Sequence, residues 1–340
     1  MHMEFYLQFY NNWLITLSYE QKVNKNNKLC IAIQADPLHS LKTKSDSTLF
    51  IAAELCKRGY RTFFYTPQDL FLQDNVCVAK GDFAHVEFTG QESKFTLQEK
   101  SHINLDDIAA ILIRQDPPFD MSYITNTYLL DKINPKVLIL NNPIAIRSHS
   151  EKVMAFKFAE FIPPSMIISS LQNEAIEFIK EHKQVVIKPL YWFGGKYLEF
   201  LEWDNVDNIE TKITLSLQKH QHIIIQKFLQ KVYEGDKRII VIDGKVEAVM
   251  KRIPQSGNFI ANLAAGGSAE KTEITLKEQK IIDVIGPYLK SQGIIFAGVD
   301  MIDEYLIEIN ITSPTGLVAI EQLYGLNLAK PIVDYIERKI

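Results

Sequence analysis

The order of its apolar segments constrains the fold of this chain more strongly than any other feature. In the first third, strand-like runs alternate with a helical stretch over 46–58, which predicts a parallel sheet with ligands near the carboxyl ends of its strands. Later strand-like runs are joined by turns such as Asp243-Gly244, which predicts antiparallel sheet. The predicted fold class is α/β followed by α+β. The runs lie at 28–35, 61–65, 109–114, 137–140, 184–189, 197–201, 223–229, 237–242 and 246–252.

Length and charge limit the classes of protein to which the chain can belong. Its 340 residues are enough for two or three domains with a buried core. A net charge of −4 and a pI near 6.1 disfavour a general nucleic-acid-binding role. Three cysteines without C-x-x-C spacing indicate a reducing cytoplasm and no structural zinc site. Residues 1–28 are too polar for a membrane span and are interpreted as an N-terminal extension and linker.

A predicted β-hairpin near the C-terminus carries three oxygen ligands. The strand-like runs 294–302 and 305–310 flank Asp303-Glu304. With an odd loop centred on Glu304, Asp300 would oppose Glu308 across the hairpin, whereas a two-residue turn would break this arrangement. The pleat returns Asn310 to the same face. Two carboxylates and an amide suit magnesium, which keeps waters or phosphate oxygens in its other positions. The alternative is an ordinary solvated polar stripe.

Four cations are candidates for binding phosphate. The chain contains no G-x-x-x-x-G-K-[ST] sequence, so a P-loop is excluded. Lys152 begins a predicted helix over 150–161, Lys188 ends an apolar strand directly before Pro189, and Arg238 and Arg252 lie on later strands. Taken singly, such lysines and arginines are more often surface residues whose aliphatic part packs on the protein while the charged group stays in water. Lys188 is the exception because of the apolar strand that precedes it.

The order of short sequence blocks supplies a resemblance to a known family. From about residue 29 to 335, the chain resembles prokaryotic glutathione synthetase, an ATP-grasp ligase. The resemblance implies an ATP-grasp fold behind an N-terminal Rossmann-like parallel-sheet domain. The matching blocks are DP at 36–37, IRQDPPFD at 113–120, NPIAIR and EK within 142–152, IKPL at 187–190, GDKR at 235–238, IDG at 242–244, RIPQ at 252–255, NLAAGG at 262–267, and GVDMI through EINITSPTG at 298–316.

The resemblance also implies domains, partners and roles. It divides the chain into a substrate-binding domain over 29–145, an ATP-grasp lid subdomain over 146–215 and a catalytic subdomain over 216–340, and it implies a homotetramer. Arg252, Lys188 and Arg238 are implied as catalytic groups, and Asp300, Glu308 and Asn310 as ligands of Mg²⁺ or Mn²⁺. The implied ATP-binding residues are Lys152, Lys188, Gly194, Gly195, Gln226, Lys227, Phe228, Leu229, Asp236, Arg238, Arg252 and Asn262, and the implied substrate contacts are Ser40, Ser47, Arg114, Ser313 and Thr315.

The implied reaction makes a peptide bond. The cysteinyl carboxylate of γ-glutamylcysteine attacks the γ-phosphorus of ATP, which gives an acyl phosphate and ADP, and the amine of glycine then displaces phosphate. An anion that attacks an anion needs neutralisation, which the metal and the Lys/Arg set would provide. The glycine-containing segment 254–269 is expected to cover the site and keep water from the acyl phosphate.

Three segments depart from the family pattern. Tyr191-Trp192-Phe193 replaces the start of a D-G-x-G-G-like turn, and Trp192 is expected to make the loop stiffer or differently folded. Phe259-Ile260-Ala261 replaces an Arg-Gly pair. Gly316-Leu317-Val318-Ala319 replaces a stretch that carries an arginine in relatives, so two basic groups are missing from the expected acceptor end. A ligase with another acceptor and a non-catalytic ATP-binding protein therefore stay open beside glutathione synthetase.

Overall fold

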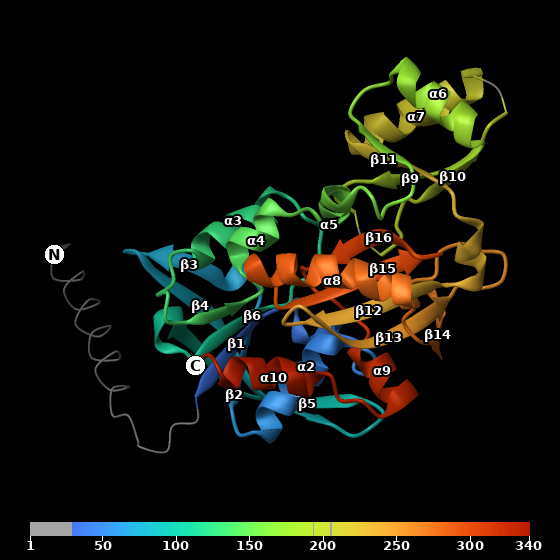
Figure 1. Ribbon diagram of the computed structural model, residues 1–340. Coiled ribbons are helices and arrows are strands. Elements are labelled where there is room, and N and C mark those ends of the chain that lie inside the picture. The colour runs from blue at the N-terminus through green and yellow to red at the C-terminus, as the bar shows by residue number, and fades with distance from the viewer. Residues whose placement is uncertain (1–28, 193, 205) are drawn as a thin grey trace, which may run out of the picture.

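The computed structural model describes residues 29–192, 194–204 and 206–340. The predicted N-terminal extension over 1–28 and the residue Phe193 lie outside the described residues. Three sheets follow one another along the chain, and Figure 1 shows the middle one standing away from the other two. Among the described residues, no helix is both long and apolar enough to cross a membrane.

The first sheet has seven strands in the order β3-β4-β2-β1-β6-β7, with β5 paired to β4. Its parallel part, as predicted, consists of β1 (Cys30–Gln34), β2 (Arg61–Tyr65), β6 (Ala110–Ile113) and β7 (Leu138–Leu140). An antiparallel edge that the sequence analysis did not anticipate consists of β3 (Leu70–Gln73), β4 (Val76–Phe88) and β5 (Ser93–Asn104). The accompanying helices are α2 (Ser47–Lys57), α3 (Met121–Leu130) and α4 (Pro143–Ser148).

The helix predicted over 150–161 is shorter than expected. It ends after one turn as α5 (Glu151–Met154) and continues as a 3-10 turn, Ala155–Phe158. The chain then enters the second sheet, which is antiparallel in the order β10-β9-β11-β8. The elements of this unit are β8 (Ser165–Ile168), α6 (Asn173–His182), β9 (Gln184–Pro189), β10 (Glu199–Glu202), α7 (Val206–His220) and β11 (Ile223–Lys227).

The third sheet is antiparallel in the order β14-β13-β12-β15-β16. On one face, Ile239 and Val299 pack with α8, and on the other, Ile240 and Met250 pack with α9 and α10 in a core that continues into α2. Figure 1 shows α2, α9 and α10 together below this sheet. Its elements are β12 (Asp236–Ile242), β13 (Lys245–Ile253), β14 (Ser268–Lys271), α8 (Leu276–Ser291), β15 (Phe296–Ile302), β16 (Tyr305–Asn310), α9 (Leu317–Tyr324) and α10 (Ala329–Glu337).

The β15–β16 hairpin reaches the predicted pairing by an unexpected route. Its turn consists of two residues, Asp303 and Glu304, both with positive φ (50° and 63°), and not of an odd loop centred on Glu304. A bulge then shifts the register, which skips Ile307 and pairs Asp300 with Glu308. The expected loop length was therefore wrong, but the opposition of the two carboxylates is confirmed because the bulge adds the missing residue.

The limits of the predicted domains stay a prediction. β11 pairs with β8 and β9 in the second sheet, so a boundary between residues 215 and 216 separates this strand from its neighbours.

Candidate functional site

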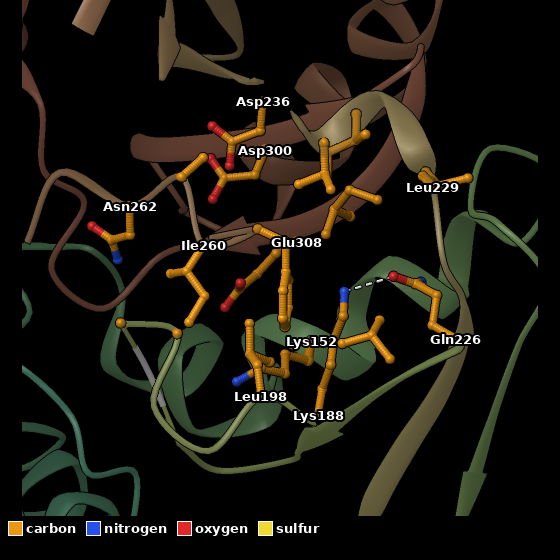
Figure 2. A pocket seen from close by; sticks show the side chains of 18 of the residues that line it. Lys152, Lys188, Leu198, Gln226, Leu229, Asp236, Ile260, Asn262, Asp300 and Glu308 are labelled. Atoms are coloured by element: carbon orange, nitrogen blue, oxygen red, sulfur yellow. Dashed lines mark hydrogen bonds between the residues drawn. The ribbon is translucent and has the colours of Figure 1, made fainter. Parts of the chain in front are cut away.

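One pocket lies between the second and third sheets and gathers residues from distant parts of the sequence. Asp236 and Asp300 face Lys152 and Lys188 across it (Figure 2). All residues predicted to bind nucleotide or metal line this pocket: Lys152, Lys188, Gly194, Gly195, Gln226, Lys227, Phe228, Leu229, Asp236, Arg238, Arg252, Asn262, Asp300, Glu308 and Asn310.

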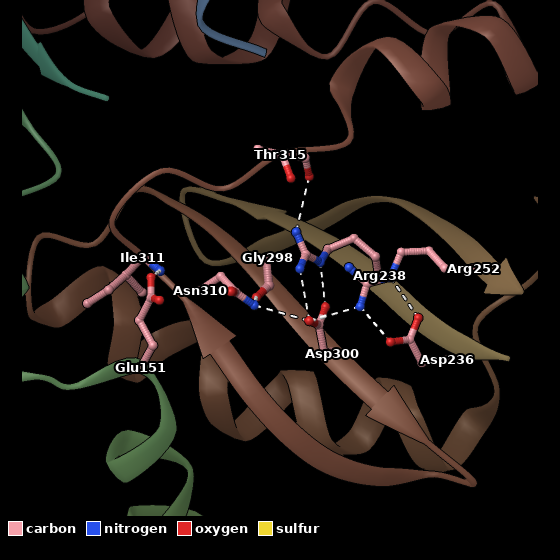
Figure 3. Close-up of polar contacts among 9 residues, drawn as sticks. All are labelled: Glu151, Asp236, Arg238, Arg252, Gly298, Asp300, Asn310, Ile311 and Thr315. Atoms are coloured by element: carbon pink, nitrogen blue, oxygen red, sulfur yellow. Dashed lines mark hydrogen bonds and ion pairs between the residues drawn. The ribbon is translucent and has the colours of Figure 1, made fainter. Parts of the chain in front are cut away.

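A chain of ion pairs forms the floor of the pocket (Figure 3). Strand register creates it, because Arg238 pairs with Asp300 across β12–β15 and Asp236 pairs with Arg252 across β12–β13. Arg238 binds Asp300 through Nε and through Nη2, the latter 2.8 Å from Oδ2. Arg252 Nη2 lies 2.6 Å from Asp236 Oδ2 and 3.0 Å from Asp300 Oδ2. Burial alone would raise the pKa of Asp300, but the two guanidinium groups outweigh burial and lower this pKa.

Two lysines approach from the opposite side. Lys188, at the end of β9, donates from Nζ to Gln226 Oε1 at 2.6 Å, and Gln226 donates in turn to Ser165 Oγ at 2.8 Å. Burial lowers the pKa of Lys188 to about 8, against the opposing effect of Glu308. Lys152 is also buried and donates from Nζ to the carbonyl oxygen of Trp192. Both ammonium groups therefore meet oxygen atoms that phosphate could replace.

The oxygen-ligand set predicted from the hairpin lies on one side of the pocket. Asn310 Nδ2 donates to Gly298 O at 3.1 Å and to Asp300 Oδ2 at 3.2 Å. Within the described part of the chain, the Glu308 carboxylate has no hydrogen bond or ion pair. No three His, Cys, Asp or Glu side chains gather as a metal site there. Two carboxylates and one amide oxygen still fit magnesium, which takes its remaining oxygens from water and phosphate.

The glycine loop makes its turn without a positive φ at Trp192. Its positive φ angles fall on Gly194 (67°), Gly195 (76°) and Tyr197 (61°), and not on Trp192. Trp192 packs edge-on against Tyr197, with ring centroids 4.8 Å apart. The aromatic residues thus anchor the loop beside the pocket, while the glycines make the turn.

The lid contacts this loop through apolar groups. A Cβ atom at Gly195 would lie 2.6 Å from Ile260 Cγ2, so Ile260 packs directly on the glycine backbone. Phe259 lies edge-on to Phe228, with centroids 5.8 Å apart. The position expected to hold an Arg-Gly pair therefore makes an apolar closure over the pocket.

The second position at which a basic group is missing, in the 316–319 stretch, does not line the pocket. Val318 is 1% exposed and lies in the core with Ile240 and Met250, next to the N-terminal sheet. Val318 therefore contributes to core packing, and the expected effect of the 316–319 stretch on the acceptor end stays a prediction.

The predicted substrate residues gather in part. Arg114 donates to Thr48 Oγ1 at 3.2 Å and to Pro314 O at 2.9 Å, and its Nη1 is buried without a partner among the described residues. Ser313 donates to Arg114 O at 3.1 Å. Thr315 O accepts from Arg238 at 3.2 Å, and Ser47 Oγ accepts from Leu317 N at 3.2 Å.

Ser40 stands apart from this group. It is exposed, and its hydroxyl donates to Pro37 O at 2.7 Å.

A second, smaller cavity adjoins the pocket between the second and third sheets. Lys152 and Trp192 border both cavities, and Phe119, Glu151 and Thr312 lie only on the second. Sequence reasoning did not single out Glu151, although it precedes Lys152 in the EK pair. The signal that could have revealed it is a carboxylate next to a phosphate-binding candidate at the start of a short helix.

Comparison with known proteins decides the family. The model of the prokaryotic glutathione synthetase N-terminal domain matches residues 29–147, and the model of the ATP-grasp domain of the same enzymes matches residues 151–325. The chain belongs to the prokaryotic glutathione synthetase family. It is 37% identical to the glutathione synthetase of Rhodopseudomonas palustris over 311 residues, 92% of this chain and 99% of that one. It is 34% identical to that of Coxiella burnetii over 317 residues, 92% of this chain and 97% of that one.

Solved structures confirm the predicted fold of this family member. The ATP-grasp ligase PsnB in complex with a minimal precursor superposes with a TM-score of 0.60 at 16% identity, and covers 92% of this chain and 100% of that one. D-alanyl-alanine synthetase A from Vibrio cholerae gives 0.59 at 12% identity over 92% and 98% of the chains. At these identities the likeness shows the fold alone, which is ATP-grasp. Membership of the family makes the chain an ATP-dependent ligase.

Proposed function

We propose that this chain joins γ-glutamylcysteine to glycine, consumes ATP and forms an acyl phosphate on the way. The observation that carries the proposal is the convergence of four cations and three oxygen ligands on one pocket. The pocket residue Arg238 donates to Thr315 O, and the same segment of chain carries the Ser313–Arg114 contact. A carboxylate donor and a nucleotide can meet at this junction. The chain's similarity to glutathione synthetases over their nearly complete length supports the choice of substrates.

The first step needs charge neutralisation more than proton transfer. A donor carboxylate oxygen attacks the γ-phosphorus, the bond to the bridging oxygen breaks, and ADP leaves. We assign the neutralisation of the phosphates to Lys152 and Lys188 on one side and to Arg238 and Arg252 on the other. Gln226 would position Lys188, as its 2.6 Å hydrogen bond suggests. Phe228 and Leu229 would pack against the adenine.

The metal is part of the same proposal. Asp300, Glu308 and Asn310 would hold Mg²⁺ or Mn²⁺, because Glu308 lacks a partner among the described residues and the other two lie beside it on one face. Such an ion supplies charge neutralisation at phosphate oxygens.

The second step needs a dry site. The acceptor amine attacks the carbonyl carbon, loses a proton, and phosphate departs with one former carboxylate oxygen. The apolar contact between Ile260 and Gly195 would exclude water from the acyl phosphate until the acceptor amine attacks it. We place the donor near Arg114, Ser313 and Thr315, and we expect the reaction to occur in the cytoplasm with the protein as a homotetramer.

The acceptor is where a second candidate function has support. The lid presents Phe259 and Ile260 instead of a cation, and this observation supports an acceptor without a carboxylate as the second candidate. A screen of ADP release over donor and acceptor pairs separates the candidates. We expect release only with γ-glutamylcysteine and glycine together. Release with a neutral amine but not with glycine would establish the second candidate, and ATP binding without any turnover would contradict both.

A further inference from the structure

The segment that follows β16 is held largely by side chains. β16 ends at Asn310 and α9 begins at Leu317, so the backbone between them has no regular partners. Asn141 Nδ2 donates to Ile311 O at 2.8 Å, Arg114 to Pro314 O at 2.9 Å, and Arg238 to Thr315 O at 3.2 Å. These contacts satisfy carbonyl groups, and the N–H groups need an acceptor.

Glu151 is that acceptor. Its Oε1 accepts from Ile311 N at 2.7 Å, from Thr312 N at 2.9 Å and from Thr312 Oγ1 at 2.8 Å. One carboxylate oxygen therefore binds three donors on two consecutive residues. Hydrogen bonds to an ionised carboxylate are about twice as strong as neutral ones. Figure 3 shows Glu151 reaching Ile311 beside Asn310.

The position of these bonds links three groups of the proposed site. Ile311 directly follows the proposed metal ligand Asn310, and Thr312 directly precedes Ser313. β16 is the edge strand of its sheet, so no further strand fixes its outer side. Glu151 lies on α5 beside Lys152, whose ammonium reaches the glycine loop at Trp192. A shift of Glu151 would therefore displace the proposed metal ligand Asn310, the donor-site residue Ser313 and the phosphate-binding candidate Lys152.

We propose that Glu151 is a positioning residue that fixes the end of β16, and so sets the orientation of Asn310 toward the metal and of Lys152 toward the phosphates. The inference rests on the metal set proposed above. It goes beyond that set because Glu151 acts only through the residues that it holds.

Metal-dependent nucleotide binding tests this role without turnover. The half-saturating Mn²⁺ concentration for binding a non-hydrolysable ATP analogue is measured by calorimetry, together with the melting temperature. Glu151→Ala loses all three bonds and is expected to raise the half-saturating Mn²⁺ about 10- to 100-fold, the usual effect of removing a group that orients a metal ligand. Glu151→Gln keeps an acceptor oxygen and is expected to recover most of the loss.

A buried glutamate away from the site serves as the matched control. Glu54 accepts from Arg58 and Asn327 and joins α2 to the C-terminal part of the chain. Glu54→Ala is expected to lower the melting temperature and to leave the Mn²⁺ requirement unchanged. If Glu151→Ala behaves like Glu54→Ala, its role is purely structural and the proposal is overturned.

Two further variants keep the outcome decisive. If Glu151→Ala does not fold, Thr312→Val removes only the hydroxyl donor and is expected to raise the Mn²⁺ requirement about threefold; no change would overturn the proposal. Glu308→Ala separates this inference from the metal set. If Glu308→Ala loses the Mn²⁺ dependence of binding but Glu151→Ala behaves like the wild type, only the role of Glu151 is overturned. If both variants keep the wild-type Mn²⁺ dependence, the metal set is overturned.

Discussion

The two walls of the proposed nucleotide pocket differ in chemical character. The third sheet contributes charged groups whose places follow from strand register, such as Arg238 opposite Asp300 and Asp236 opposite Arg252. The covering loops contribute apolar groups, with Ile260 on Gly195 and Phe259 on Phe228. The matching residues Arg238, Arg252 and Asp300 lie on strands of this sheet, whereas two of the three departures from the family pattern lie in the loops.

This difference shows where the chain can vary without loss of its chemistry. A substitution on β12 or β15 leaves a buried charge without its partner, which is costly. A loop residue can change from a cation to an apolar group because Phe259 and Ile260 cover the pocket through apolar contacts. Substitutions on the strands should therefore act mainly by removing a charge. Substitutions in the loops should act mainly by changing how the side chains fit against one another.

The largest effect is expected for Arg238→Ala. It leaves the buried Asp300 without the guanidinium that binds both of its oxygens, so the free energy of unfolding should fall by about 3–5 kcal/mol. Turnover should fall by at least about 10²- to 10³-fold. Urea unfolding and steady-state ADP release measure the two effects. Arg58→Ala, which breaks ion pairs with Asp334 and Glu337 near the surface, is the control and should leave turnover unchanged.

Glu308→Gln should separate activity from stability on the same sheet. Because Glu308 has no partner in the described part of the chain, the free energy of unfolding should stay within about 0.5 kcal/mol of the original value. Turnover should fall about 100-fold or more if the carboxylate binds the metal. Unchanged turnover in this variant would remove Glu308 from the metal set.

Two glycine variants test whether the loops respond to shape. Gly195 and Gly257 have similar positive φ angles (76° and 81°), but a Cβ at Gly195 would meet Ile260 Cγ2 at 2.6 Å, whereas nothing lies within 4 Å of one at Gly257. Gly195→Ala should weaken ATP binding about 10- to 100-fold, and Gly257→Ala clearly less. Adding Ile260→Ala should restore part of the loss in Gly195→Ala. Equal effects at the two glycines would show that backbone strain, and not the contact with Ile260, determines the loss of ATP affinity.

The smallest effect is expected from pH. Phosphates favour protonated Lys188, whose pKa of about 8 in the folded chain lies below the ordinary 10.5. ATP affinity should therefore fall about tenfold between pH 7 and pH 9. The stability of the ligand-free protein should change in the opposite sense, because the cost of the buried charge is full below pH 8 and disappears as pH rises toward 10.5. Lys188→Arg should give a flat affinity profile in the same binding titration.

Parity and periodicity predicted the parts of the site that lie on strands. Asp300, Glu308 and Asn310 share a face because side chains alternate along a strand. The two-residue turn was not predicted, because parity alone required an odd loop and did not include the bulge that restores the pairing of Asp300 with Glu308. Glu151 escaped prediction because its partner Ile311 lies 160 residues away. Ser40 lies outside the hydrogen-bonded group formed by the other predicted substrate residues, and its role as a substrate contact stays a prediction.

Isotope transfer tests the central claim most directly. γ-Glutamylcysteine labelled with ¹⁸O in its cysteinyl carboxylate is incubated with ATP, glycine and the protein, and the released phosphate is analysed by mass spectrometry. An acyl phosphate carries one carboxylate oxygen into the phosphate when the amine displaces it. The account predicts one ¹⁸O per phosphate, released only when glycine is present. Unlabelled phosphate, or release independent of γ-glutamylcysteine, would contradict it.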